Sequence, residues 1–220
     1  MSQLIWEGKA ELNRPFFVIA LEGLFDAAGA ATSSVDRLVT SYQAKPLAQI
    51  DPEIFFNFQE ERPIVKIGDH GREIVWPTNS IWSATCPDGN HDLVLLSGVE
   101  PHLRWRTFAD SLLEIAQSTN AEMVITLGAM AGMAPHTRPL GVVGSAADPA
   151  TADRLGLGRP TYEGPTGLVG ALHDQLDKAG MPVISLRVSV PHYVPNPPNP
   201  EATRSLLSRL ELVTGIKTHH

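Results

Sequence analysis

Four short apolar runs stand out along the chain, each bounded by charged or turn-forming residues. They cover residues 16–21, 93–97, 123–127 and 183–190. Continuous apolar runs of this length are typical of central strands that are covered on both faces. Apolar residues at helical spacing occupy the segments 27–39, 101–115, 168–176 and 200–213. This alternation predicts a three-layer α/β fold, in which a mixed, mostly parallel sheet carries helices on both faces.

A strand-like interlude lies between the first two of these units. Residues 54–58, 64–67 and 72–76 are short segments rich in branched and aromatic residues, and residues 68–71 form a turn between the last two. This pattern predicts an antiparallel hairpin added to the parallel core. A second turn is expected at residues 87–90, where the chain returns to the sheet.

Two stretches resist regular structure. Residues 128–167 are crowded with Gly, Pro, Ala and Asp and contain one strand-like segment at 140–143, and residues 195–200 consist of proline and asparagine. Long irregular connections are usually functional loops. Neither stretch is long or polar enough to mark a domain boundary. We therefore expect residues 1–220 to form a single α/β domain.

Composition narrows the classes of function. Of the 220 residues, 43% are hydrophobic and 19% are charged, and the 17 Lys and Arg against 24 Asp and Glu give a net charge of −7. This balance does not build the basic surface that a nucleic acid or an anionic membrane requires. The first apolar run has six residues, too few for a signal peptide or a membrane span. We expect a soluble cytoplasmic protein with neither a nucleic-acid nor a membrane partner.

The motifs of common enzyme classes are missing from the sequence. There is no G-x-S-x-G nucleophile turn, no G-x-x-x-x-G-K-[ST] phosphate loop, and no G-x-G-x-x-G after the first predicted strand. Cys86 is the single cysteine, and no Cys or His spacing matches a zinc site. The sequence therefore predicts no catalytic residue, no metal and no cofactor.

Polar side chains follow all four predicted central strands. A glutamate follows each of the first two, a histidine and an arginine come after the third, and a His-Tyr pair follows the fourth. Ligands of open α/β sheets bind outside the carboxyl ends of parallel strands, so a binding cleft at this rim is one interpretation. The candidate binding residues are Glu22, Glu100, Trp105, His136, Arg138, Tyr162, Glu163, His192 and Tyr193.

The same residues also have a structural interpretation. Polar residues are expected at strand ends in any α/β fold, because the chain leaves the core there. A histidine at such a position often bonds a carbonyl, a glutamate can accept backbone hydrogen bonds, and Trp105 is suited to packing. Both interpretations of the rim stay open at this point.

Short segments with a recognisable order run along the chain. They are residues 51–58 (DPEIFFNF) with 62–63, 98–105 (GVEPHLRW), 127–128 with 135–139 (PHTRP), 162–167 (YEGPTG), 180–182 with 185–186, 191–194 (PHYV) and 199–200. In this order, and over nearly the whole chain, they resemble the proteasome assembly chaperone family of the second type, in its actinobacterial form.

The resemblance implies an α/β fold like that of the nucleoside phosphorylase and peptidyl hydrolase group. It also implies self-association and a role in assembling or accompanying proteasome subunits, and it implies no catalytic residue. Members of this form usually continue into further helical sequence, an extension that we expect this chain to lack. Some proteasome-docking relatives end in a hydrophobic-Tyr-any-residue signature, which residues 217–220 do not carry. Docking by that route is not expected.

Two hypotheses for the function follow. The first is a non-enzymatic, self-associating protein-binding module with a proteasome-related client. It predicts an exposed apolar surface that includes Phe55, Phe56, Phe58 and Trp82, unless these aromatic residues pack inside the hairpin. The second is a small-molecule binder or an enzyme of hydrolase or phosphorylase type. In it, Arg138 binds an anionic group at the cleft, and the glutamates and histidines act as acids or bases.

Overall fold

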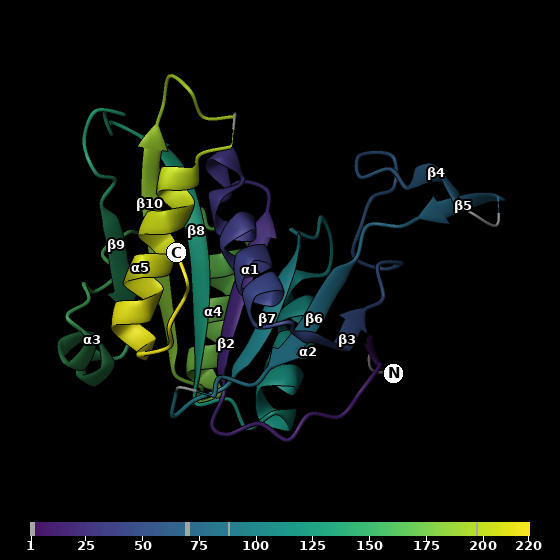
Figure 1. Ribbon diagram of the computed structural model, residues 1–220, viewed down its shortest axis with the longest axis horizontal. Helices are drawn as coiled ribbons and strands as arrows, with labels where there is room; N and C mark the ends of the chain where they lie inside the picture. Colours follow the sequence, from purple (N-terminus) through teal and green to yellow (C-terminus); the bar gives the residue numbers. More distant parts are fainter. Residues whose placement is uncertain (1–2, 69–70, 88, 197) are drawn as a thin grey trace.

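The computed structural model describes residues 3–68, 71–87, 89–196 and 198–220, and Figure 1 shows how its elements are arranged. Within these residues, eight strands form one sheet in the order β1-β3-β6-β7-β2-β8-β10-β9. The strands are β1 (Leu4–Trp6), β2 (Phe16–Glu22), β3 (Lys45–Ile50), β6 (Asn79–Ala84), β7 (Leu93–Val99), β8 (Met123–Gly132), β9 (Val142–Ala146) and β10 (Val183–Pro191).

The centre of the sheet is parallel and is built from the four apolar runs. Strands β7, β2, β8 and β10 are neighbours, and each adjacent pair runs in the same direction. Strand β6 is antiparallel to β7, and β3 is antiparallel to β6, so β3 again points along the central strands. The two edge strands, β1 and β9, are antiparallel to their neighbours. The prediction of a mixed, mostly parallel sheet is confirmed.

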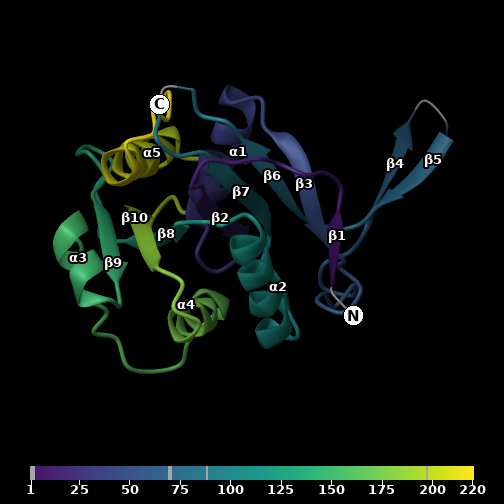
Figure 2. The same ribbon diagram turned by 90° about the horizontal axis from the view of Figure 1, so that it is seen from below.

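Helices cover both faces of this sheet, as the view in Figure 2 shows. Helices α1 and α5 pack on one face, and helices α2 and α4 pack on the other. The helical elements are η1 (Ala27–Gly29), α1 (Ala30–Ser41), α2 (Trp105–Ser118), α3 (Pro149–Leu155), α4 (Leu168–Lys178) and α5 (Pro200–Thr214).

The alternation of side chains along β2 explains why the protein has two hydrophobic cores. Phe16, Val18 and Ala20 point into the core beneath α1 and α5, whereas Phe17 and Ile19 point into the core beneath α2 and α4. Successive residues of a strand face opposite sides of the sheet, so a strand that is covered on both sides must be apolar throughout. This requirement is the physical reason for the continuous apolar runs.

Residues 54–58 are not a strand, which corrects one prediction. The backbone N–H groups of Phe55 and Phe56 both donate to the carbonyl of Pro52, at 3.0 and 3.2 Å, so the chain turns tightly there. The turn buries both phenylalanine rings in the core, where Phe55 is fully buried. Phe58 and Trp82 are partly buried. The aromatic residues that the self-association hypothesis placed on the surface therefore belong mainly to the core.

Local backbone geometry shifts two helix starts from their predicted positions. The second helix begins at Trp105 and not at Pro101. Arg104 has left-handed backbone angles (φ 55°, ψ 42°), which separate the helix from the turn before it. Positive φ angles at Ala28 (59°) and Gly29 (61°) divide the predicted helix 27–39 into η1 and α1. Periodicity places the apolar face of a helix, but it does not identify such breaks.

The stretch 128–167 contains more regular structure than its composition indicates. Strand β8 continues to Gly132, and β9 overlaps the segment 140–143 that was predicted to be strand-like. Helix α3 follows, and its N-terminus is capped by the Asp148 side chain, which accepts a hydrogen bond from the Thr151 N–H group at 2.7 Å. Strand β3 was not predicted either, because its sequence KPLAQI is partly polar.

The predicted hairpin is present as a separate two-stranded sheet. Strands β4 (Ile64–Gly68) and β5 (Gly71–Val75) pair antiparallel and project from the rest of the protein (Figures 1 and 2). Asp69 and His70 of the predicted turn, Asp88 of the second turn and Pro197 of the proline-rich stretch lie outside the described residues. Among the helices of the described segments, none has the length and apolar character needed to cross a membrane.

Candidate functional site

An open groove lies at the carboxyl ends of β2 and β7, next to the start of α2. It has a volume of about 560 Å³, and three of the predicted site residues, Glu22, Glu100 and Trp105, line it. Residues 57–61 add Glu60 and Glu61 to its lining. The groove therefore combines four carboxylates with apolar surface, and that apolar surface comes from Val99, Pro101, Leu103 and Trp105.

The Glu100 carboxylate joins two backbone segments at this rim. Its Oε1 atom accepts a hydrogen bond from the Leu168 N–H group at the start of α4, and its Oε2 atom accepts one from the Leu24 N–H group after β2, both at 3.4 Å. The N–H groups at a helix N-terminus are unpaired and carry partial positive charge, so a carboxylate is favourable there. Glu100 thus occupies the place where α4 would otherwise attract an anionic ligand.

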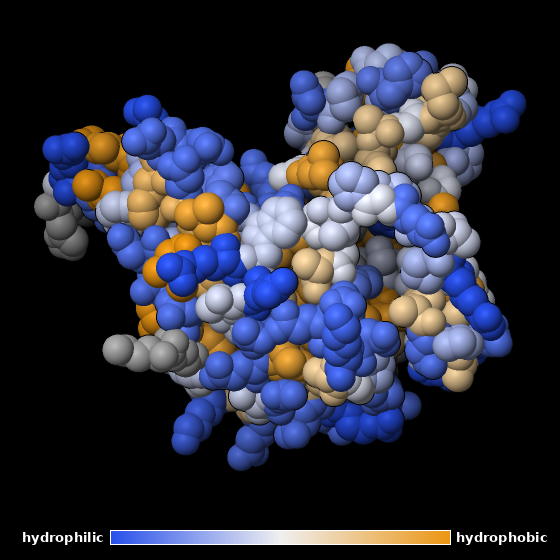
Figure 3. Space-filling view, turned by 180° about the vertical axis from the view of Figure 1, so that it is seen from behind, coloured by the Kyte–Doolittle hydropathy of each residue, from blue (hydrophilic) through white to orange (hydrophobic). Residues whose placement is uncertain are grey.

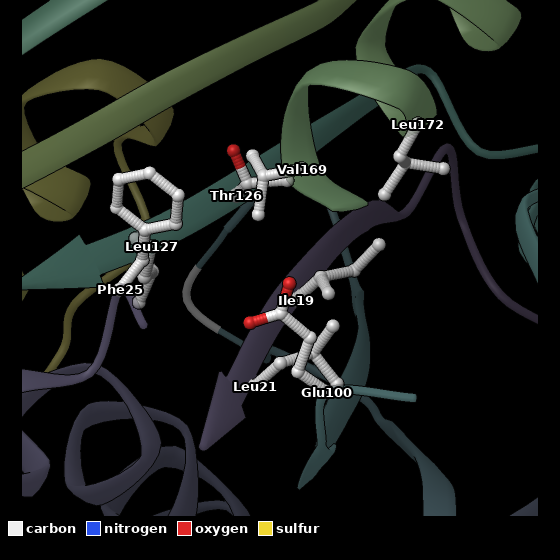
Figure 4. A pocket seen from close by; sticks show the side chains of 8 residues that line it. All are labelled: Ile19, Leu21, Phe25, Glu100, Thr126, Leu127, Val169 and Leu172. Carbon is white, nitrogen blue, oxygen red and sulfur yellow. The ribbon is translucent and has the colours of Figure 1, made fainter. Parts of the chain in front are cut away.

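A small cavity lies beneath α4, beside Glu100. Figure 4 shows Glu100 together with side chains of β2, β8 and α4 around it, among them Ile19, Thr126 and Leu172. Its volume of about 10 Å³ offers room for one water molecule at most. An organic ligand does not fit there, whereas the open groove has room for one.

A second group of predicted residues meets at the ends of β8 and β10. The Tyr193 hydroxyl accepts a hydrogen bond from the His136 backbone N–H at 3.0 Å and lies 2.6 Å from His136 Nδ1. The rings of His192 and Tyr193 meet edge to face, with their centroids 5.4 Å apart. The His192 N–H donates to the Gly132 carbonyl at 3.1 Å. These contacts anchor the loop after β8 to the end of β10.

The remaining three predicted residues lie on exposed loops. The backbone N–H of Arg138 donates to the Pro135 carbonyl, and the Tyr162 hydroxyl donates to the Pro165 carbonyl at 3.0 Å, so both contacts are local. Within the described residues, no hydrogen bond or ion pair joins Arg138, Tyr162 or Glu163 to the groove or to the His136–Tyr193 pair. The structure thus places the nine candidate residues in separate groups along the rim.

One buried and one partly buried ionisable residue near this rim were not singled out by the sequence. Asp26 follows β2 and caps α1, where its Oδ1 atom accepts hydrogen bonds from the N–H groups of Ala31 (2.7 Å) and Thr32 (3.2 Å). Burial raises the pKa of the Asp26 carboxyl above its ordinary value. The hydrogen bonds to Ala31 and Thr32 lower this pKa, but their effect is smaller than that of burial. The signal that identifies it is an aspartate just before a run of small residues at helical spacing.

The second is His173 of α4, whose Nε2 atom lies 2.8 Å from the Thr126 hydroxyl of β8. Burial, with a smaller contribution from the positive charge of Arg187, lowers the pKa of His173 to about 4. The imidazole is therefore neutral at physiological pH. A histidine on the inner face of a predicted helix is the available sequence signal, and it indicates packing rather than catalysis.

The described residues offer little catalytic chemistry. Burial, followed by the negative charge of Asp92, raises the pKa of the Cys86 thiol to about 12, so Cys86 stays protonated and unreactive at neutral pH. No group of three or more His, Cys, Asp or Glu side chains in the described segments is arranged to hold a metal ion. What the rim offers is a groove with carboxylate and apolar walls, which suits the binding of a basic, partly apolar partner.

The Tyr193 hydroxyl provides a test of how the loop after β8 is held. We expect Tyr193→Phe to lower the free energy of unfolding by no more than about 1 kcal/mol, because the bonded groups are exposed. The same variant should accelerate hydrogen exchange of the His136 amide, which loses its acceptor. His192→Ala is the matched control: it retains the Tyr193 hydroxyl and the backbone bond to Gly132, so exchange at His136 should stay as in the wild type. Equal exchange in all three proteins would contradict this account.

The chain is similar to a known protein family in sequence and to several solved structures in fold. The family model described as the PAC2 family matches residues 20–220. The crystal structure of a PAC2 family protein from Streptomyces avermitilis is 41% identical in sequence, with a TM-score of 0.89 over 93% of this chain and 87% of that chain. No curated protein matches the sequence.

Two further structures are informative. A proteasome-assembly chaperone homologue from Mycobacterium tuberculosis is 42% identical, with a TM-score of 0.84 over 91% of this chain and 86% of that chain. Pyrococcus furiosus PbaB, an archaeal proteasome activator, has a TM-score of 0.79 over 98% of this chain and 91% of that chain. Its sequence is 16% identical, so this likeness shows the fold alone.

Proposed function

Because the chain belongs to the PAC2 family, we propose that it is a non-enzymatic, self-associating protein-binding module that takes part in proteasome assembly. Its mycobacterial relative, a proteasome-assembly chaperone homologue, supports the choice of client. With a client of this kind, the protein acts in the cytoplasm. An assembly chaperone binds its client through exposed surface and releases the client later. Apolar surface on the folded protein is suited to such binding.

The observation that carries this proposal is the exposed apolar hairpin. Ile64, Val65, Ile67, Ile74 and Trp76 are all exposed, and Ile67 reaches 81%. An isolated two-stranded hairpin is marginally stable in water, and contiguous apolar surface of this kind marks sites of protein interaction. The hairpin therefore supports both self-association and client binding.

The chemistry at the rim supports a non-enzymatic role. The Glu100 carboxylate bonds backbone N–H groups, and the His136 ring bonds the Tyr193 hydroxyl. At the opposite end of the sheet, the Cys86 thiol is buried and protonated. A nucleophile with an adjacent base, which covalent catalysis requires, is not formed by these groups.

Reconstitution with purified proteasome subunits tests this function. The chain is mixed with the α and β subunits of a 20S proteasome from an actinobacterium, and complexes are followed by native electrophoresis over time. We expect a complex of the chain with free subunits and faster formation of assembled particles. Ile67→Ser should weaken both effects, whereas Leu212→Ser, at a similarly exposed leucine on α5, should leave them unchanged. The absence of any complex, with unchanged assembly, would contradict the proposal.

A second candidate function is the binding of a small molecule in the groove. The observation that favours it is the volume of about 560 Å³ at the carboxyl ends of β2 and β7, with Glu22, Glu100 and Trp105 in its lining. Thermal-shift measurements with nucleosides, inorganic phosphate and divalent metals address it directly. A shift that Glu22→Gln abolishes would support this function, and unchanged melting with all three classes would contradict it.

A further inference from the structure

The projecting hairpin has two chemically different faces. We call its residues 64–68 and 71–76 the arm. Residues directly opposite in an antiparallel pair lie on the same face, and Val65 pairs with Ile74 while Ile67 pairs with Arg72. Trp76 follows Ile74 at the strand period and continues this face. The apolar face of the arm therefore consists of Val65, Ile67, Ile74 and Trp76, with the single charge of Arg72.

The other face of the arm is more polar. Lys66 lies opposite Glu73, and Ile64 lies opposite Val75 nearer the body of the protein. Every described residue of β4 and β5 is exposed. Figure 3 shows the arm standing away from the body, with apolar surface along it. At the base of the arm, the Trp76 ring meets the Phe58 ring edge to face, with the ring centroids 4.8 Å apart.

The groove complements the apolar face of the arm. It has apolar lining from Val99, Leu103 and Trp105. Of its glutamates, Glu22 and Glu61 match the positive charge of Arg72, because Glu100 bonds backbone N–H groups and Glu60 lies 3.7 Å from His102. Within the described residues, the Glu22 and Glu61 carboxylates have no hydrogen-bond or ion-pair partner. The chain as a whole carries a net charge of −7. The apolar face of the arm differs from this average, because its single charged residue is an arginine. Arm and groove are thus complementary in both polarity and charge.

We propose that the apolar face of the arm docks into the groove of a second copy of this chain, and that the second copy returns its own arm in the same way. This inference rests on the self-association of the proposed function and assigns the surfaces that form it. Both complementary surfaces are on one chain, so two copies related by a two-fold axis satisfy both at once and close the assembly. A partner of different chemistry would satisfy one of them only.

The reciprocal contact brings an area near the lower limit for a stable dimer. The exposed parts of the four large apolar side chains of one arm, at about half of roughly 200 Å² each, give on the order of 400 Å². Two arms thus bring on the order of 800 Å², and the groove surface that they cover adds to it. Stable interfaces bury about 1,200–2,000 Å² in total. Arginine in such a desolvated contact can pair with a carboxylate in bidentate geometry.

Charge exchange between arm and groove tests this docking. The arm variant is Arg72→Glu, and the groove variant combines Glu22→Arg with Glu61→Arg. The mass of each full-length protein is measured by light scattering over a dilution series. Each variant alone should show a dimer dissociation constant raised at least about tenfold, because like charges then face each other. An equimolar mixture of the two should regain the wild-type dimer, since both contacts of the mixed pair join opposite charges.

Matched variants and alternative outcomes make the test decisive. Glu201→Arg with Arg204→Glu, at an exposed ion pair on α5, should leave the dissociation constant unchanged. If the wild type dimerises and the arm and groove variants dimerise equally well, the docking is overturned while self-association stands. If the variants lose the dimer and the mixture does not regain it, the pairing of arm with groove is overturned. If the wild type is monomeric at every concentration, the self-association of the proposed function fails as well.

Discussion

Replacing Gly98 with alanine should destabilise the protein by about 2 to 4 kcal/mol, one of the largest effects expected from a single methyl group in this fold. A Cβ atom at Gly98 would overlap Oδ1 of Asn79 and lie 2.8 Å from its Cγ. Asn79 is fully buried, and its Oδ1 atom accepts the Val99 N–H at 2.9 Å. The amide cannot move without losing this bond and leaving a buried polar group unpaired. Chemical denaturation measures the change.

The control for this substitution is Gly141→Ala, where a Cβ atom would meet nothing within 4 Å. We expect its free energy of unfolding to stay within about 0.5 kcal/mol of the wild type. In the Gly98→Ala background, Asn79→Ala removes the clashing amide and should recover part of the lost stability. A Gly98→Ala protein as stable as Gly141→Ala would show that the contact of β7 with Asn79 does not hold this rim in place.

Acidification should destabilise the protein through His173, the second large effect. The folded-state pKa of His173 is about 4, below its ordinary value of 6.5. Above pH 6.5 the residue is neutral in the folded and the unfolded protein, and it contributes no pH dependence. Between pH 6.5 and 4 the unfolded chain binds a proton that the folded protein does not, so stability falls by up to about 1.4 kcal/mol per pH unit. Below pH 4 this contribution levels off.

The variant His173→Gln isolates this contribution because glutamine does not titrate. Denaturation at a series of pH values should give a smaller loss of stability for His173→Gln than for the wild type between pH 6.5 and 5. Asp148 and Glu211, whose folded-state pKa values are lowered mainly by hydrogen bonds to Thr151 and Thr218, act at lower pH. Identical slopes for the two proteins in the upper window would contradict the burial of a neutral imidazole between α4 and β8.

The central sheet could be predicted from the sequence because its strands are covered on both faces. Burial on both sides makes most positions of β2, β7, β8 and β10 apolar, and this leaves a run that is visible without any knowledge of partners. Strand β3 has no such constraint over its full length and was missed. Residues 54–58 have the composition of a strand, but the tertiary contacts of Phe55 with Phe108, whose ring centroids are 5.3 Å apart, favour a buried turn.

The candidate site could be predicted only in part, for a reason of chain geometry. Glu22 ends β2 and Glu100 directly follows the adjacent parallel strand β7, so strand register alone brings them together. His136 and Tyr193 meet through a side-chain hydrogen bond after strands β8 and β10. Arg138, Tyr162 and Glu163 belong to loops whose path depends on local turns, and the sequence does not determine where such loops lead. Sequence order therefore predicted the rim, but not which of its residues share a groove.

The sequence predicted an exposed apolar surface, but the exposed apolar residues lie a few positions away from the predicted ones. Phe55 and Phe56 lie in the core, and a group of exposed apolar residues lies on the adjacent hairpin. The two segments have similar composition, and the difference arises from packing: the turn at Pro52 directs the phenylalanine rings inward, whereas β4 and β5 leave the body of the protein. Composition alone does not distinguish a buried aromatic turn from an exposed apolar arm.

The measurement that tests the central claim most directly is the mass of the wild-type chain by light scattering over a wide dilution series. The claim of a self-associating module requires a mass that rises above that of the 23.8 kDa chain as concentration increases, and that reaches at least twice this value. A mass that stays at one chain, 23.8 kDa, at every concentration would contradict the claim, because the exposed apolar arm would then remain uncovered in the free protein.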